Sequence, residues 1–182
     1  MDDNIIAKKI VDMIPDSFNG SLLDVPVGTA VFTIEKYKKL KFASITCLDY
    51  SVDMLKQAKQ RFEKNKLTNI TCVQGDVGKL QFKDESFDFV LSMNGFHVFP
   101  DKDKAFYETA RVLKKGGTFC GSFYIKGECK RSDFVANMVL SKKGWFTPPF
   151  QTKEELIRIL NHYYSKVELY SEKALVLFRC EK

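Results

Sequence analysis

A glycine and a carboxylate stand at a spacing that suits a ribose-containing ligand. Asp24 ends a short apolar run, and Gly28 follows it in a segment with the residue types of a turn. Asp49 ends a second apolar run over residues 45–48. An acidic residue about 20 positions beyond a glycine turn can accept hydrogen bonds from both hydroxyls of a ribose. The spacing therefore predicts a nucleoside-containing cofactor at the carboxyl ends of parallel strands.

Strand-like and helical patterns alternate along the chain and would position these residues. The predicted strands cover residues 20–25, 44–49, 69–74, 87–92, 117–124, 165–171 and 174–181. The predicted helices cover residues 3–14, 29–40, 51–65, 101–114, 131–141 and 152–162, and Gly116-Gly117 is expected to cap the fourth of them. This order predicts an α/β fold, a Rossmann-like, doubly wound and mostly parallel seven-stranded sheet with helices on both faces. The turn near residue 172 is too short for a parallel crossover, so an antiparallel C-terminal strand is expected.

Composition and charge favour one globular domain over residues 1–182. The net charge of +6 comes from dispersed lysines, which indicates solvated helix faces more than a nucleic-acid surface, although a basic groove for an anionic acceptor stays open. The five cysteines are odd in number and form no C-x-x-C pair, so we expect no metal site and a reducing, cytoplasmic location. No apolar run is long enough for membrane insertion.

Five motifs occur in a fixed order between the first predicted strand and the fifth. They are Leu23-Asp24-x-x-x-Gly28-Thr29, Leu48-Asp49-Tyr50-Ser51-x-x-Met54-Leu55, Gly75-Asp76-Val77, Phe87-Asp88-x-Val90 and Ala110-Arg111-Val112-Leu113-Lys114-x-Gly116-Gly117. In this order they resemble the class I S-adenosylmethionine-dependent methyltransferases, and most closely the small-molecule group of the ubiquinone/menaquinone-biosynthesis type. The resemblance extends from Leu22 to the C-terminus.

The resemblance implies that one loop supports the methionine part of S-adenosylmethionine. The loop residues are Asp24, Val25, Pro26, Gly28 and Thr29. The family has glycines where this chain has Pro26 and Ala30. Pro26 lacks an N–H, and Ala30 adds a methyl group where helix and sheet approach each other closely. We still expect cofactor binding.

For the rest of the cofactor, the resemblance implies that Asp49 binds the ribose hydroxyls while Tyr50 and Met54 enclose the adenine. Asp76 would accept from the adenine amine, and the Val77 N–H would face the ring. Asn94 would lie between cofactor and acceptor. Three alternatives stay open: Asp76 as a turn residue, Met54 as helix core and Tyr50 as a plain surface residue.

Methyl transfer needs alignment in a water-poor site, and a base only where the acceptor must lose a proton. His97, just beyond the fourth strand, is the candidate base or acceptor contact, with a purely structural histidine as the alternative. His162 is not expected to act. The reaction would convert S-adenosylmethionine into S-adenosylhomocysteine while methylating a small molecule.

The acceptor is expected to lie beneath two segments. Residues 1–18 form a short N-terminal helix and partial lid, and residues 126–150 an acceptor-side insert; cover from a homodimer partner is the alternative. Apolar residues of the insert would line the acceptor pocket or form a satellite core: Phe134, Met138, Trp145, Phe146 and Phe150.

Other functions stay open beside the main one. They are methylation of RNA or protein, and a non-catalytic cofactor-binding or scaffold module. A nicotinamide dehydrogenase is disfavoured because the chain lacks the G-x-G-x-x-G helix start.

Overall fold

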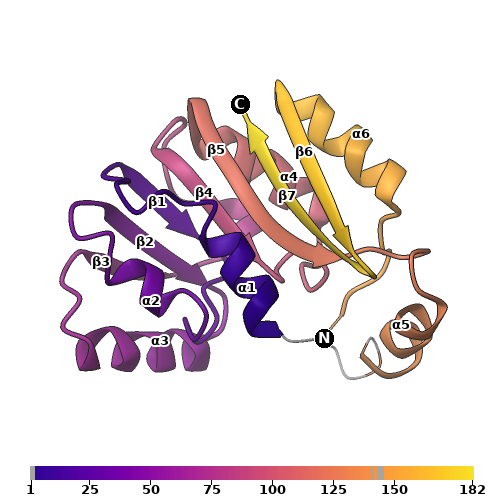
Figure 1. Cartoon of the computed structure of the whole chain (residues 1–182), viewed down its shortest axis with the longest axis horizontal. Helices are drawn as coiled ribbons and strands as arrows, with labels where there is room; N and C mark the ends of the chain where they lie inside the picture. The colour runs from indigo at the N-terminus through magenta and orange to yellow at the C-terminus, as the bar shows by residue number, and fades with distance from the viewer. Residues whose placement is uncertain (1–2, 141, 143–145) are drawn as a thin grey trace.

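Seven strands form one sheet within residues 3–140, 142 and 146–182, the part of the chain that the computed structural model describes (Figure 1). The strands are β1 (Ser21–Asp24), β2 (Ser44–Asp49), β3 (Ile70–Gln74), β4 (Phe87–Met93), β5 (Leu113–Tyr124), β6 (Lys166–Glu172) and β7 (Leu175–Glu181). Their order across the sheet is β3-β2-β1-β4-β5-β7-β6. The strands β1 to β5 are parallel, and β7 runs antiparallel to both β5 and β6. The predicted architecture is confirmed, including the antiparallel C-terminal strand.

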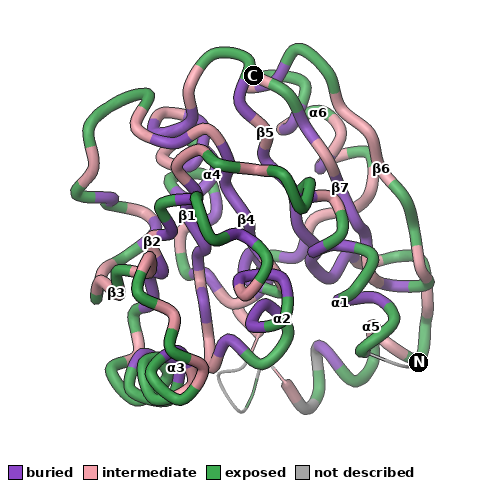
Figure 2. The backbone as a smooth tube through the Cα atoms, turned by 60° about the vertical axis from the view of Figure 1, so that its left-hand side comes forward, coloured by how far each residue is buried: buried purple, intermediate pink, exposed green. Residues whose placement is uncertain are grey.

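Helices cover both faces of this sheet (Figure 1). They are α1 (Asp3–Val11), α2 (Ile34–Tyr37), α3 (Val52–Lys64), α4 (Lys102–Val112), α5 (Lys130–Val135) and α6 (Lys153–Tyr163), with a 3-10 turn η1 (Val77–Lys79) and a π turn η2 (Ala136–Leu140). Because side chains alternate along a strand, Leu22 and Phe89 pack with α1, α2 and α3, while Leu23 and Val90 pack with α4 and α6. Figure 2 shows the central strands β1, β4 and β5 as largely buried between these two helical layers.

The helix predicted over residues 29–40 is wrong in length. Only α2 (Ile34–Tyr37) is helical, and residues 31–33 before it form turns. Gly28 and Ala30 both have φ of +56°, a left-handed conformation that a right-handed helix cannot include. The loop after β1 is therefore longer than the pattern of apolar residues indicates.

The predicted glycine cap at the end of the fourth helix is also wrong. Helix α4 ends at Val112, and Leu113 already pairs with Phe87 as the first residue of β5. The pairing register of β4 and β5 shifts between Phe87 and Phe89, and the Gly116 N–H donates to the carbonyl of Lys182 at 2.8 Å. The sheet pairing of this segment outweighs its local helix-ending signals. The helix predicted over 131–141 is divided into α5 and η2, and residue 141 lies outside the described residues.

The N-terminal segment is part of the sheet face that carries α2 and α3. Ile6, Ile10 and Ile14 are buried in that core. The buried Lys36 donates to the carbonyl of Ile14 at 2.8 Å, and Arg179 donates to the carbonyl of Met13 at 2.8 Å. The start of α1 and helix α5 lie at the same end of the molecule (Figures 1 and 2). A role for residues 1–18 as a lid stays a prediction.

Asp88 joins the first residues of three neighbouring strands. Its carboxylate accepts from the Ser21 N–H at 2.8 Å, the Ser21 hydroxyl at 2.7 Å and Lys114 Nζ at 2.8 Å. Partial burial opposes ionisation, but the hydrogen bonds from Lys114 and Ser21 prevail and lower the pKa of Asp88 to about 2. The charged Asp88 therefore stabilises the start of β1, β4 and β5.

We expect Asp88→Ala to lower the free energy of unfolding at pH 7 by about 1–2 kcal/mol, measured by urea denaturation. Because the folded-state pKa is lowered, this contribution is present above pH 3.8 and is lost as the pH falls toward 2. The control is Asp84→Ala, since Asp84 pairs with Arg111 but its side chain is 76% exposed. We expect the control to change stability by less than about 0.5 kcal/mol. Equal losses for the two variants would contradict the role of Asp88.

Candidate active site

Three cavities lie in a row along the carboxyl edge of the strands. The loop cavity, about 210 Å³, is lined by Asp24, Pro26, Val27, Gly28, Thr29, Ala30, Val31, Phe32, Thr33, Met93 and Asn94. The strand-edge cavity, about 360 Å³, is lined by Val25, Pro26, Leu48, Asp49, Tyr50, Gly75, Asp76, Val77, Val98, Phe99 and Pro100. The outer cavity, about 650 Å³, is lined by Asn94, His97, Tyr124, Arg131, Ser132, Val135, Ala136, Leu140, Phe146, Lys173, Ala174 and Leu175. Pro26 is common to the first two and Asn94 to the first and third, so the cavities adjoin.

The strand order of the sheet explains why the row lies here. The chain places β2 and β3 on one side of β1, and β4 and β5 on the other. The loops that leave β1 and β4 therefore diverge, and a crevice forms between them. All the predicted cofactor-binding residues except Met54 line the loop cavity or the strand-edge cavity. Met54 lies on α3, is 39% exposed and lines neither of these cavities.

Asp49 connects two of the loops that form the crevice. One carboxylate oxygen accepts from the Gly28 N–H at 2.8 Å, and the other accepts from the Ser51 N–H at 2.9 Å. Asp49 is only 7% exposed, so the two bonds hold the carboxylate in a defined orientation. Each oxygen keeps a further acceptor position, so the pair can receive two adjacent hydroxyls.

Gly28 leaves the wall of the loop cavity open. A Cβ added there would meet no atom within 4 Å. A ligand can therefore approach the backbone at Gly28 closely.

Pro26 is accommodated by a second glycine that the sequence interpretation missed. A Cβ on Gly95 would lie 2.4 Å from Cδ of Pro26 and 2.9 Å from Cζ of Phe99. The loop after β4 thus makes room for the proline ring only because residue 95 has no side chain. Gly95 thus compensates, on the facing loop, for the bulk of the ring at Pro26.

Asp24 is a buried carboxylate at the base of the loop cavity. It is 1% exposed and accepts from the Tyr37 hydroxyl at 2.6 Å. Burial raises the pKa of Asp24 to about 7; the Tyr37 hydrogen bond opposes this rise and the nearby Asp49 adds to it. Tyr37 was not predicted, and its position inside a predicted helix was its only sequence signal.

The adenine-side residues have local roles as well. One oxygen of Asp76 accepts from the Gly78 N–H at 2.8 Å and caps η1, so the turn-forming alternative is realised while the second oxygen stays available. Tyr50 is 77% exposed at the mouth of the strand-edge cavity. Sequence reasoning missed the apolar wall opposite, residues 98–100, because an apolar loop segment has no periodicity to mark it.

His97 is buried between the outer cavity and the loop after residue 145. Its Nδ1 accepts from the Tyr124 N–H at 3.3 Å, which places the proton of the neutral ring on Nε2. Burial, with a smaller effect of Lys102, lowers the pKa of His97 to about 4. The ring is therefore neutral at pH 7 and can donate from Nε2. This supports the acceptor-contact reading of His97 more than the base reading.

The apolar residues that were predicted to line the acceptor pocket lie in different parts of the structure. Phe146 lines the outer cavity, with its ring centroid 4.1 Å from that of His97. Phe150 instead belongs to a small buried core with Tyr124, Ala136 and Ala174. The two remaining described residues, Phe134 and Met138, are exposed, and Trp145 lies outside the described residues. The insert thus contains both a satellite core and part of a cavity wall.

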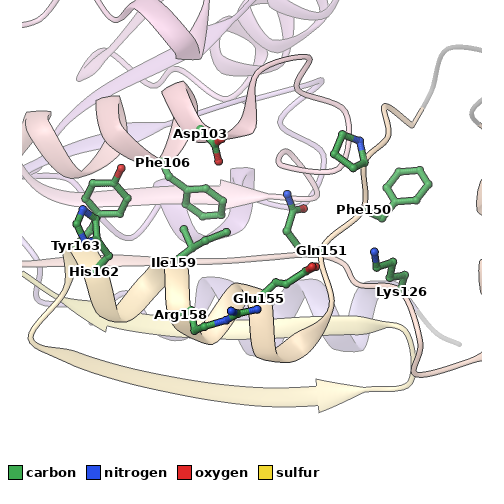
Figure 3. A pocket seen from close by; sticks show the side chains of 11 residues that line it. Asp103, Phe106, Lys126, Phe150, Gln151, Glu155, Arg158, Ile159, His162 and Tyr163 are labelled. Atoms are coloured by element: carbon green, nitrogen blue, oxygen red, sulfur yellow. The ribbon is translucent and has the colours of Figure 1, made fainter.

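A further groove of about 520 Å³ lies between α4 and α6 (Figure 3). Phe106 and Ile159 face each other across it, and His162 lies at one end. It shares no lining residue with the three cavities of the row. His162 therefore lies outside the candidate site.

We expect Asp24→Asn to increase stability at pH 8 in the absence of cofactor. The raised pKa means that the folded protein keeps a proton that the unfolded chain loses near pH 3.8, so wild-type stability falls as the pH rises toward 7. Asparagine can still accept from Tyr37 but carries no charge. Urea denaturation should show a gain on the order of 1–3 kcal/mol at pH 8 and little change at pH 4. A gain that is equal at both pH values would contradict this explanation; Asp53→Asn is the surface control.

We expect Gly95→Ala to lower the free energy of unfolding by about 1–3 kcal/mol because the added methyl group overlaps Pro26. The same substitution in a Pro26→Gly background should cost less, since the nearest contact is gone. Thermal or urea unfolding of the four proteins in the cycle measures the coupling. Additive effects would show that Gly95 does not accommodate Pro26.

Comparisons with known proteins agree with this geometry. Residues 23–121 match the family described as "Methyltransferase domain". An uncharacterized chloroplastic methyltransferase of Arabidopsis thaliana is 36% identical over 148 residues, 79% of this chain and 37% of that protein. A demethylmenaquinone methyltransferase of Lactiplantibacillus plantarum is 36% identical over 100 residues, 54% of this chain and 42% of that protein. The chain thus spans less than half the length of these curated relatives.

Solved structures share the fold. A putative methyltransferase of Bacillus halodurans superposes with a TM-score of 0.79 at 19% identity, covering 97% of this chain and 98% of that one. A protein of Thermotoga maritima described as an S-adenosylmethionine-dependent methyltransferase has a TM-score of 0.74 at 22% identity, covering 99% and 89%. With the family match extending over more than half of the residues and over the loops that form the crevice, the chain belongs to the methyltransferase-domain family.

Proposed function

We propose that the chain binds S-adenosylmethionine across the strand-edge and loop cavities and methylates a small molecule in the outer cavity. The observation that carries the proposal is the position of Asn94, which lines both the loop cavity and the outer cavity. A methyl donor bound in the loop cavity and a methyl acceptor bound in the outer cavity would meet at this residue. The family match and the solved structures described as S-adenosylmethionine-dependent support the choice of cofactor.

The residues of the strand-edge cavity fit an adenosine. Asp49 binds the ribose hydroxyls with the acceptor positions that Gly28 and Ser51 leave open. Tyr50 offers an aromatic face, and Asp76 offers its free carboxylate oxygen to the adenine amine. The apolar wall that includes Phe99 excludes water from the ring.

The residues of the loop cavity fit the amino-acid part of the cofactor. Asp24 lies where a carboxylate can pair with an ammonium group, and Gly28 lets the backbone approach. S-adenosylmethionine, when bound, supplies a methyl group on a positively charged sulfur. The methyl group passes to the acceptor, and the sulfur becomes the neutral thioether of S-adenosylhomocysteine. Catalysis then depends mainly on alignment and on exclusion of water.

Two residues position the acceptor. Asn94 has φ of +53°, and its side-chain oxygen accepts from the Ser122 hydroxyl at 3.1 Å. Its own N–H donates to the Ser122 carbonyl at 2.8 Å. His97 offers an Nε2–H donor to a heteroatom of the acceptor. This hydrogen bond from His97 orients the methyl acceptor, and His97 does not take a proton from it.

A small molecule is favoured because the outer cavity has a volume of about 650 Å³, within the size range of ligand pockets. Relatives named demethylmenaquinone methyltransferase and malonyl-[acyl-carrier protein] O-methyltransferase support a small or carrier-bound acceptor. Cofactor binding is favoured because the cavities stay open despite Pro26 and Ala30, and a non-catalytic cofactor-binding or scaffold module stays an alternative. RNA or protein methylation remains the alternative, and salt-sensitive binding to RNA would favour it.

Location and assembly remain proposals. All five cysteines are free thiols, which suits a reducing compartment such as the cytoplasm. Among the described residues, none of the helices has the length and apolar character needed to cross a bilayer. A homodimer that covers the outer cavity stays a prediction, and light scattering would test it.

We expect calorimetric titration to show micromolar binding of S-adenosylmethionine and S-adenosylhomocysteine. Asp49→Ala should weaken both by at least about tenfold, because it removes the ribose contacts and the bond that orders Gly28. The control is Asp53→Ala, since Asp53 is an exposed acid that lines neither cofactor cavity. A folded wild-type protein that binds neither compound would refute the proposed function. Undiminished binding by Asp49→Ala would refute the proposed ribose site.

A further inference from the structure

We infer that the outer cavity accepts an elongated apolar molecule with an anionic oxygen group, and that Arg131 and Lys173 bind this group. The inference rests on the proposed function, since it treats the outer cavity as the acceptor site. It adds the chemical class of the acceptor and the orientation in which it binds.

The walls of the outer cavity are mainly apolar. Val135, Ala136 and Leu140 come from α5 and η2, and Leu175 comes from β7. Tyr124 also lines the cavity. Its hydroxyl donates to Asp133 at 2.5 Å, so the apolar ring is the part of this side chain that we assign to the wall. These surfaces suit a hydrocarbon or aromatic body that is transferred from water on binding.

The charged residues of the cavity are of one sign. Arg131 and Lys173 are the cationic residues among its described lining, which includes no acidic residue. Arg131 belongs to α5, and Lys173 lies in the turn between β6 and β7, so two distant segments direct positive charge to one cavity. Neither side chain forms an ion pair within the described residues.

The acidic residues next to them in sequence are engaged elsewhere. The Asp133 carboxylate accepts from the Tyr124 hydroxyl and from the Gly127 N–H. Glu172 pairs with Lys9 of α1. Within the described residues, neither carboxylate therefore forms an ion pair with Arg131 or Lys173. An anionic ligand group would satisfy both cationic side chains, through charge-assisted hydrogen bonds.

Lys173 lies at some distance from Asn94, the residue that the outer cavity shares with the loop cavity. Asn94 is bonded to Ser122 of β5, and Ser122 pairs with Leu177 of β7. Lys173 lies four residues from Leu177 along the hairpin, which at about 3.3 Å per residue is on the order of 10 Å. The anionic group is therefore an anchor at the Lys173 end, and the methylated atom lies nearer Asn94, with His97, which is bonded to the Tyr124 N–H, between the two.

The test uses matched probes on protein saturated with S-adenosylhomocysteine. The probes are 2-naphthoate, 2-naphthyl phosphate and the neutral 2-naphthamide, and calorimetry gives the dissociation constant of each. We expect one or both anions to bind the wild type at least about tenfold more tightly than the amide. The anion that binds more tightly identifies the group as carboxylate or phosphate.

The variant is the double substitution Arg131→Gln/Lys173→Gln. We expect it to bring anion and amide affinities within about twofold by weakening only the anion. The control, Lys130→Gln/Lys166→Gln, also removes two positive charges, from exposed residues that do not line the cavity, and should keep the preference.

Three results would overturn the inference: equal affinities in the wild type, no binding of any probe, or an anion preference that survives in the double variant. The S-adenosylhomocysteine titration comes first and separates the two hypotheses. If that compound does not bind, the proposed function fails. If it binds and the anion preference is absent, only the acceptor class is refuted.

Discussion

The carboxylate of Asp49 holds the crevice together. It ends β2, and it bonds to the loop after β1 through Gly28 and to the N-terminal cap of α3 through Ser51. Parallel strands deliver their carboxyl ends to one edge, but nothing in the sheet itself sets how the loops beyond that edge lie. A buried carboxylate must find donors, and here the donors are backbone groups of two separate loops. The same two bonds hold its remaining acceptor positions in a defined orientation, so the arrangement of the loops and the proposed ribose contact depend on one side chain.

The loop after β1 shows how a family site can tolerate an unusual sequence. Pro26 lies in this loop, and the facing loop has a glycine at residue 95 where any side chain would overlap the proline ring. Ala30 takes the left-handed conformation that glycine would adopt more easily. Tyr37 supports the base of the loop by donating to the buried Asp24. The shape that binds the cofactor is thus preserved by neighbours of the loop and not by the loop's own glycines.

The positive charge of the chain has two different settings. Most lysines lie on solvated faces or pair with acids, as Lys36 does with Asp16. Arg131 and Lys173 instead meet at the outer cavity without an acidic partner there. A net charge of +6 could not distinguish these settings, because it counts residues without placing them. The chemical meaning of these two charges comes from their location on a mainly apolar cavity that adjoins the loop cavity at Asn94.

Much of the fold and part of the site were determined by the sequence alone. Alternating apolar residues determined which strand side chains face each side of the sheet. In the structure, Ser51 caps α3, and Thr152 and Glu155 form a capping box at the start of α6. The order of these elements predicted the sheet, and the spacing of Asp24, Gly28 and Asp49 predicted the crevice.

Only the tertiary structure decided the rest. Leu113 begins β5 because it pairs with Phe87, although its neighbours carry the signals of a helix end. Gly95 matters because it faces Pro26, and Arg131 and Lys173 act together because α5 and the β6–β7 turn reach the same cavity. Local signals depend on residues a few positions apart, whereas these features arise from contacts between segments far apart in the chain. No periodicity or motif records such contacts, because they exist only after the sheet has brought the segments together.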